Sequence, residues 1–455
     1  MRQKRELILS FAGTDDELPK TVRQYHEKYK GISVALDQVP QILDLVHRDV
    51  LTLTEGNRRR GRSADFSSET ILRALIVMIV GGLSYRETVV RIADSEFLQD
   101  FIRTRKKAVM DHTFLNKCFK AIEPSTWKRV NELLVAHCVQ EGCIDPSVIR
   151  TDTTVVECNV HYPTDSSLLW DVWRVASRIL RRGRKLDRAS VPHRLHDRKI
   201  KKLYLDITRY SASKSKQRQR LVKQAFRTLI ERVTWIVAIS QQFCDYASGS
   251  ALPALAGLGA QLADILPPMK QVVAQASRAQ LDGEKVPGSE RVYSIFEPHT
   301  ELIKRGRRHK SVEFGHAVLL CQTREKFITD YDAFEHKPAD CNLTAQVIDR
   351  HEKLFGKTPE VLAGDKGFCP DAETYEELAE RVDTLAIPRR MRDFADAALT
   401  AWQAFRAGIE GTISGLKRAF RLVRCYFRTF KSFQSSIGLS VFCHNLIVLS
   451  PSEVT

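Results

Sequence analysis

The most restrictive feature of the chain is the run at residues 148–156, in which most side chains are apolar or β-branched on both faces of the expected strand. Such a run is typical of a strand in the middle of a sheet whose two faces are both covered. A single carboxylate, Asp152, lies inside it. Because a buried carboxylate is costly unless it is paired or bound to a metal, we predict a functional role for Asp152. The alternative is an aspartate on a surface strand that faces solvent.

The sequence before this run is mostly helical in pattern. Apolar residues recur at helical spacing in 71–79, a glycine pair follows, and Ser84 with Glu87 forms a capping box for a second helix that extends to about Ala93. Two helices joined by a short glycine turn are compatible with a helix-turn-helix, and equally with a small bundle that serves packing or dimerisation. We therefore assign residues 1–145 to a helical DNA-binding or dimerisation domain.

The sequence after the run predicts a sheet interrupted by helices. Residues 163–288 are helical in pattern, with a break expected at Pro267-Pro268. The later patterns are strands at 291–296, 313–322, 326–331, 360–363 and 384–387, and helices at 342–355, 372–381 and 397–420. This order matches an RNase H-like core with one strand to spare. The predicted fold is therefore α/β: an RNase H-like mixed sheet core at 146–162 and 289–455, an all-α N-terminal domain and a basic helical insertion.

The formal charge of +16 is concentrated in one segment of the chain. Residues 172–232 contain 20 Lys and Arg but only 4 Asp and Glu, so this segment alone has a net charge of +16 and the rest of the chain is balanced. A concentrated cationic segment suggests a polyanion as partner, because binding to phosphates releases their counterions. The alternative is a charged helix that is simply solvated.

The cysteines and the apolar stretches indicate in which cell compartment the protein is expected. The chain has 10 cysteines with no CxxC pair and no regular spacing, which argues against a zinc ribbon. Cys321 and Cys443 lie in apolar surroundings that are typical of reduced core residues in a cytosolic protein. The N-terminal apolar stretch is too short for a signal peptide, and 71–80 is far shorter than the roughly 20 residues of a membrane span. We expect a cytoplasmic protein without a membrane partner.

Two further carboxylates lie in contexts that suit an active site. Asp365 follows a short apolar run beside a glycine, which is ordinary turn chemistry but also the strand end where α/β sheets place ligands. At 100° per residue, Arg406, Glu410 and Lys417 line one flank of the apolar stripe of a helix. The alternative there is a plain i,i+4 ion pair. Carboxylates from two strands and a helix can converge to hold two divalent metals, which act on phosphodiesters.

Basic residues near these positions are predicted to contact DNA. Arg418 and Arg421 follow the helix and are interleaved with aromatic residues, a combination that suits contact with the phosphate backbone. Arg307 and Arg308 form a basic turn, for which DNA contact and a plain surface turn are both open.

Several segments of the chain resemble the DDE transposases of bacterial insertion sequences. The resemblance rests on residues 150–157, 363–368 and 408–418, which carry the three carboxylates in the order of that family. Residues 67–101 are similar to the helical N-terminal domain of the same transposases. The insertion at 163–288 resembles that of the longer members, which are usually left unclassified.

The spacing of the charged residues on the last helix is also similar to a signature of these transposases. Three residues separate Arg406 from Glu410 and six separate Glu410 from Lys417, as in the best-known large superfamily. That signature has a tyrosine three residues before the arginine, where this chain has Gln403. This departure weakens assignment to a subfamily but leaves the carboxylates in place.

The resemblance implies a transposase that binds the terminal inverted repeats of its own element. Asp152, Asp365 and Glu410 would hold two Mg²⁺ ions, or Mn²⁺ in their place, and Arg406 and Lys417 would hold the phosphate near the scissile bond. Hydrolysis would free a 3′-OH that then attacks target DNA, on the bacterial nucleoid and with at least a dimer in the complex. The alternatives are an RNase H-like nuclease without strand transfer and an inactive DNA-binding regulator.

Overall fold

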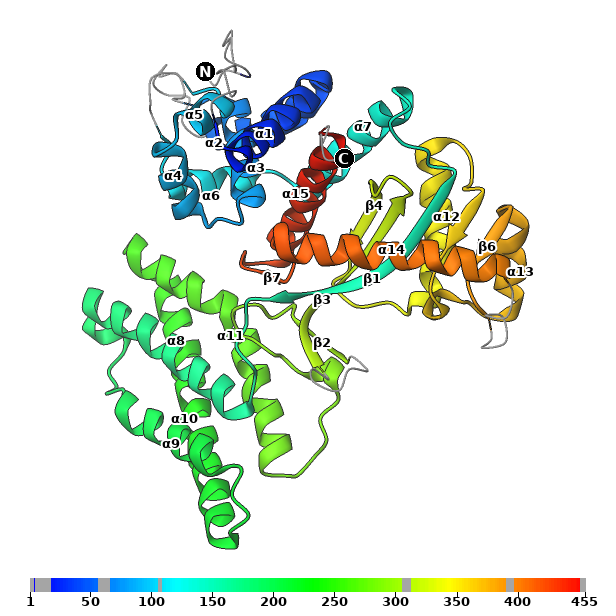
Figure 1. Ribbon diagram of the computed structural model, residues 1–455. Helices are drawn as coiled ribbons and strands as arrows, with labels where there is room; N and C mark the ends of the chain where they lie inside the picture. The colour runs from blue at the N-terminus through cyan, green and yellow to red at the C-terminus, as the bar shows by residue number, and fades with distance from the viewer. Residues whose placement is uncertain are drawn as a thin grey trace. The chain divides into compact units, whose positions relative to one another are not determined.

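The computed structural model describes residues 4, 18–55, 66–104, 109–304, 312–389 and 397–450. The chain forms two compact units. The first consists of Met1–Glu157 and His316–Thr455, and the second of Cys158–Gly315. Figure 1 labels the helices and strands of both units.

A mixed sheet forms the centre of the first unit. Its strands are β1 (Val148–Cys158), β3 (Val312–Thr323), β4 (Ile328–Ala333), β5 (Val361–Ala363), β6 (Thr384–Ala386) and β7 (Arg424–Cys425). The order is β3-β1-β5-β6, with β4 paired to β3 and β7 to β1. β5 runs parallel to both β1 and β6, and β4 is antiparallel to β3. The sheet confirms the predicted α/β fold, and β1 is its buried central strand.

Helices cover both faces of this sheet, so the core has three layers (Figure 1). One face is covered by α14 (Ala397–Ala419), and the other by α12 (Leu343–Phe355) and α13 (Ala372–Arg381). All three helices were expected from the sequence within one or two residues of these bounds.

The alternation of side chains along β1 decides which residues face α14. Val148 packs with the residues of α14, whereas Ile149 packs with those of α12 and α13. Because successive strand residues point to opposite faces, Arg150 and Asp152 point to the same side as Val148. The strand therefore presents Asp152 beneath the helix that carries Glu410.

Helices precede and follow the sheet in the first unit. They are α1 (Lys20–Gln38), α2 (Gln41–Glu55), α3 (Ser68–Val80), α4 (Tyr85–Ala93), α5 (Glu96–Phe101), α6 (His112–Ala121), α7 (Pro124–Gln140) and α15 (Phe430–Leu449). The capping box of Ser84 and Glu87 starts α4 as predicted. Asn131 of α7 joins these helices to the sheet: its amide donates to the carbonyls of Ile328 and Thr329, and it accepts from Asn445 of α15.

The C-terminal helix α15 was not assigned from the sequence. It is apolar on nearly all sides because it is buried among α1, α3, α7 and β4. A helix buried all round lacks the amphipathic period that sequence patterns detect. Its length and composition would also suit a membrane span, but 78% of it is buried inside the unit, as in the core helix of a folded domain.

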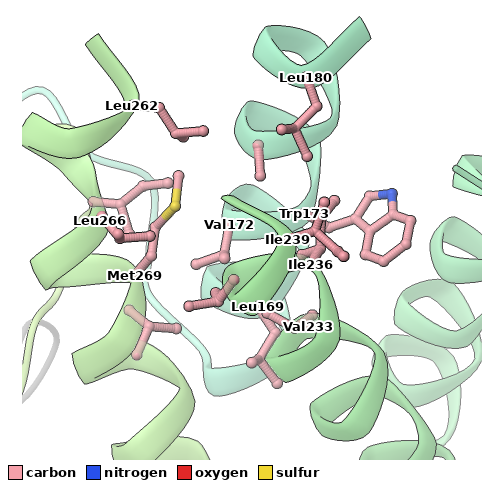
Figure 2. Packing of buried hydrophobic residues seen from close by; sticks show 14 of the residues in the cluster. Leu169, Val172, Trp173, Leu180, Val233, Ile236, Ile239, Leu262, Leu266 and Met269 are labelled. Carbon is pink, nitrogen blue, oxygen red and sulfur yellow. The ribbon is translucent and has the colours of Figure 1, made fainter. Parts of the chain in front are cut away.

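The second unit is a helical bundle with its own core. Its long helices are α8 (Asp165–Leu186), α9 (Asp197–Tyr210), α10 (Lys216–Ser248) and α11 (Pro253–Gln280). Figure 2 shows the packing of their buried side chains, among them Leu169, Val172, Trp173, Leu180, Val233, Ile236, Ile239, Leu262, Leu266 and Met269. The helical pattern of the insertion is thus confirmed.

Two predictions for this region are wrong. The expected break at Pro267 and Pro268 is absent, since both prolines lie inside α11. Burial of Leu266 and Met269 on either side of them holds the helix together despite the lost N–H donors. Residues 291–296 form no strand. The strand of this region is β2 (Glu301–Lys304), which pairs antiparallel with the first residues of β3.

Candidate active site

Asp152 and Asp365 lie on neighbouring parallel strands. The register of β1 and β5 pairs Arg150 with Ala363, and each aspartate follows its strand partner by two residues. Neighbouring strands are roughly 4.8 Å apart, so the shared register brings both aspartates to the same edge of the sheet. The charge of Asp365 acts directly on Asp152. At the strand end, Asp365 Oδ1 accepts the backbone N–H of Gly367 at 2.8 Å.

Helix α14 brings Glu410 to the same place. Arg406, one turn earlier, has its Nη1 atom 3.7 Å from Asp152 Oδ2 and 3.1 Å from Glu410 Oε1. The side chain of Asp152 is 16% exposed and that of Glu410 is 65% exposed. The i,i+4 ion pair considered from the sequence is therefore present, but Arg406 also lies beside the half-buried Asp152.

The surroundings of Asp152 disfavour the ionised form of its carboxyl group. Burial raises its pKa to about 6 from 3.8, with a further rise from Asp365 and a smaller one from Glu410. The N–H of Thr153, 2.7 Å from Oδ1, and the guanidinium of Arg406 lower the pKa of this carboxyl, but by less. A cation bound beside Asp152 would therefore stabilise its ionised form.

The residues present fit a divalent metal. Carboxylate oxygens are the ligands that Mg²⁺ and Mn²⁺ prefer, and Arg406 already places one positive charge between Asp152 and Glu410. The oxygens of the three carboxylates do not all lie within 4.8 Å of one another. Asp152 lies inside β1 and Asp365 lies two residues after β5, so both are held by the sheet. Binding of one ion by all three carboxylates would therefore need the exposed Glu410 side chain to turn away from Arg406.

A fourth carboxylate, Asp340, lies at the edge of this site and was missed in the sequence. Its Oδ1 accepts the hydroxyl of Thr153 at 3.2 Å, and its Oδ2 lies 3.4 Å from Lys337 Nζ. A Cβ placed on Gly367 would lie 3.0 Å from Asp365 Oδ1 and 3.8 Å from Asp340 Oδ2. No local pattern marks Asp340, because a turn before α12 brings it here and its partners are distant in the chain.

The predicted DNA-binding residues occupy different settings. Arg418 is exposed, whereas Lys417 and Arg421 are half-buried. Arg421 donates to a backbone carbonyl in the turn between α3 and α4. Arg307 and Arg308 lie outside the described residues. Contact of any of these side chains with DNA stays a prediction.

Together, the fold and the candidate site define an α/β core that brings near one another a carboxylate from inside β1, one that follows β5 and one from helix α14. Residues 294–446 match the family model of the transposase DDE domain. This match supports the resemblance to DDE transposases found in the sequence, and a transposase DDE domain implies an RNase H-like core. Asp365 and Glu410 lie within the matched residues, and Asp152 lies outside them. No curated protein and no solved structure matches the chain.

Proposed function

We propose that the chain is the transposase of a bacterial insertion sequence. It binds the terminal inverted repeats, cleaves a strand at the element end and transfers the freed 3′-OH to target DNA. Asp152, Asp365 and Glu410 form its metal centre and hold two Mg²⁺ ions, for which Mn²⁺ can substitute. It works on the nucleoid in the cytoplasm, and joining two ends requires at least two copies of the chain.

One observation carries this proposal. Asp152 lies close enough to Asp365 and Glu410 for their charges to raise its pKa, although it lies far outside the residues that match the DDE domain. The meeting depends on the register of β1 with β5 and on the position of α14 over β1. A carboxylate kept only for stability would not be buried beside two others that raise its pKa.

The side chains of the site have distinct roles in this mechanism. Bound divalent ions supply activation of the attacking oxygen and stabilisation of the leaving oxygen. Asp152 and Asp365, positioned by the sheet, and Glu410, positioned by α14, would hold these ions. With Glu410 bound to metal, Arg406 would be available to bind a phosphate oxygen. Lys417 lies on nearly the same face of α14 as Arg406, about 16 Å further along the helix, and contacts the backbone of the same DNA strand.

The second unit provides a cationic surface for DNA. All 20 Lys and Arg between residues 172 and 232 are exposed. Within the described part of the chain, two of them, Arg174 and Arg181, form ion pairs with aspartates. The others lie on α8, α9, the first half of α10 and the segments between these helices; Arg184 also donates to the carbonyl of His193, and Arg218 lies over the ring of Tyr210. A surface of this kind binds the phosphate backbone without regard to sequence.

The pair α3 and α4 provides a second DNA contact. These helices meet at 108° across a short turn, which is the angle of a helix-turn-helix. Gly82 in that turn has a φ of 61°, which only glycine adopts freely. α3 is buried along its whole length, whereas Arg86 and Arg91 on α4 are exposed. α4 is therefore the helix available to a DNA groove.

The test is Mg²⁺-dependent processing of labelled DNA that carries the inverted repeats flanking the gene. The wild type is compared with Glu410→Gln and with Glu377→Gln, a control that removes an exposed carboxylate on α13. We expect a free 3′-OH at the repeat boundary and joined products with wild type and control, and neither with Glu410→Gln.

The products separate the proposal from its alternatives. Cleavage without joined products would indicate a nuclease of the same fold. Specific binding of the repeats without cleavage by any of the three proteins would indicate a DNA-binding regulator, and would refute the catalytic role of the carboxylates.

A further inference from the structure

The three carboxylates lie on separate elements, so their spacing depends on what fixes α14 against the sheet. Apolar side chains such as Trp402 and Phe405 hold the helix on β1, β5 and β6, but apolar contacts are non-directional. They leave the helix free to slide or rotate by a fraction of a turn. Directional hydrogen bonds between buried polar groups are needed to set one position.

Gln403 makes such bonds on the Asp365 side. Its Nε2 donates to the carbonyl of Gly364 at 3.1 Å and to the carbonyl of Ala386 at 2.9 Å. Both N–H groups of the amide are used, and both acceptors lie at the ends of strands β5 and β6. Gly364 is the residue directly before Asp365. Gln403 therefore joins the helix of Glu410 to the backbone that positions Asp365.

Arg150 makes the equivalent bonds on the Asp152 side. It is buried, and lies on the same strand and the same face as Asp152. Its Nη1 donates to the carbonyl of Phe405 in α14 at 2.7 Å, and its Nε donates to Gln322 Oε1 at 2.8 Å. Gln322, itself fully buried, donates to Thr412 Oγ1 of α14 at 2.7 Å.

Gly408 is required for this second set of bonds. A Cβ on Gly408 would overlap the Nη1 atom of Arg150 and lie 3.0 Å from its Cζ. The guanidinium crosses the helix where residue 408 has no side chain, and the overlapped Nη1 atom is the one that donates to the carbonyl of Phe405, so a Cβ at this position would displace it from that bond. By contrast, a Cβ on Gly415 of the same helix would have nothing within 4 Å.

We propose that Gln403 and Arg150 are positioning residues, each of which ties α14 to the strand of one catalytic aspartate. Gln403 sets the distance from Glu410 to Asp365, and Arg150 sets the distance from Glu410 to Asp152. Neither residue touches substrate or metal. The inference rests on the proposed function, because it assigns a purpose to these bonds only if the three carboxylates act together.

The test uses the full-length protein with Mn²⁺ as probe. Gly408→Ala removes the Arg150 bonds without altering Arg150, and Gly415→Ala is its matched control on the same helix. Gln403→Leu removes the Gln403 bonds, and its control is Gln261→Leu at an exposed position of α11. Three quantities are measured for each: the Mn²⁺ affinity by calorimetry, the melting temperature, and the kcat of strand cleavage with the Kd for DNA.

We expect Gly408→Ala and Gln403→Leu to weaken Mn²⁺ binding at least tenfold and to lower kcat by a similar factor. Their Kd for DNA and their melting temperatures should stay close to those of the controls. Mn²⁺ affinity and kcat within twofold of wild type in both variants would overturn the proposal. Loss of cooperative melting in both would also overturn it, because the bonds would then hold the fold and not the site.

The result also separates this inference from the proposed function. Wild-type protein that binds Mn²⁺ and cleaves, with both variants unchanged, would refute the positioning role alone. Wild-type protein that neither binds Mn²⁺ nor cleaves would refute the proposed function.

Discussion

Replacing Asp152 by asparagine should stabilise the metal-free protein, although it should abolish activity. The folded-state pKa of Asp152 is about 6, above the value of 3.8 that it has when solvated. The folded protein therefore binds the proton more tightly than the unfolded chain does. Well below pH 3.8 the carboxyl is protonated in both states, and its burial then carries no ionisation penalty. As the pH rises towards 6, the free-energy cost of keeping an ionised Asp152 in the folded protein grows, and above pH 6 this cost is fully present.

The size of the penalty follows from the pKa shift. A shift of one unit corresponds to about 1.4 kcal/mol, so a rise of about two units corresponds to about 3 kcal/mol at pH 8. The side chain is 16% exposed, so solvent screens little of this. Domains of 150–250 residues melt about 2–4 °C higher per kcal/mol of added stability. Asp152→Asn should therefore raise the melting temperature by several degrees at pH 8 and by much less at pH 4, where the remaining penalty is about 0.5 kcal/mol.

The assay is calorimetric melting with EDTA at several pH values. Asp383→Asn, which removes an exposed aspartate, should change the melting temperature little at any pH. Added Mg²⁺ should stabilise the wild type by about 2.7 kcal/mol at 100 times its Kd, and should not stabilise Asp152→Asn. A variant that melts below the wild type at pH 8, or a gain that does not depend on pH, would refute this reasoning.

Three further outcomes are expected. Asp365→Asn should abolish strand cleavage and leave the Kd for DNA unchanged. Normal cleavage by this variant in a gel assay would show that Asp365 is not a metal ligand needed for cleavage. Lys199 and Lys202 on α9, both changed to Gln, should reduce the slope of log K against log salt by up to about 1.8, whereas Lys285→Gln should not change it. Arg73→Met should destabilise the fold by about 1–3 kcal/mol in denaturant melts, because it removes a buried guanidinium that pairs with Glu69, although Glu69 keeps its ion pair with Arg103. A loss below 1 kcal/mol would show that this ion pair is not needed.

Elements with a local pattern could be predicted from the sequence. α4 and α13 have the predicted bounds because their exposed and buried faces alternate with the helical period. α15 gave no such signal, since it is buried on nearly all sides. The two prolines of α11 suggested a break that tertiary packing overrides.

In the candidate site, too, local features could be predicted from the sequence and long-range contacts could not. The i,i+4 spacing of Arg406 and Glu410 is local and visible in the sequence. The bonds of Arg150 to the carbonyl of Phe405 and of Asp340 to Thr153 join residues far apart in the chain. The sequence near Arg150 and near Asp340 does not predict these partners, because the contacts arise from strand register and from the position of the helices.

The most direct test of the account is the location of Mn²⁺ by anomalous scattering in crystals of the protein with DNA of the element end. The account predicts anomalous density in contact with the carboxylates of Asp152, Asp365 and Glu410, with Arg406 moved away from Glu410. Density elsewhere, or none at these carboxylates while the same DNA is cleaved in solution, would contradict it.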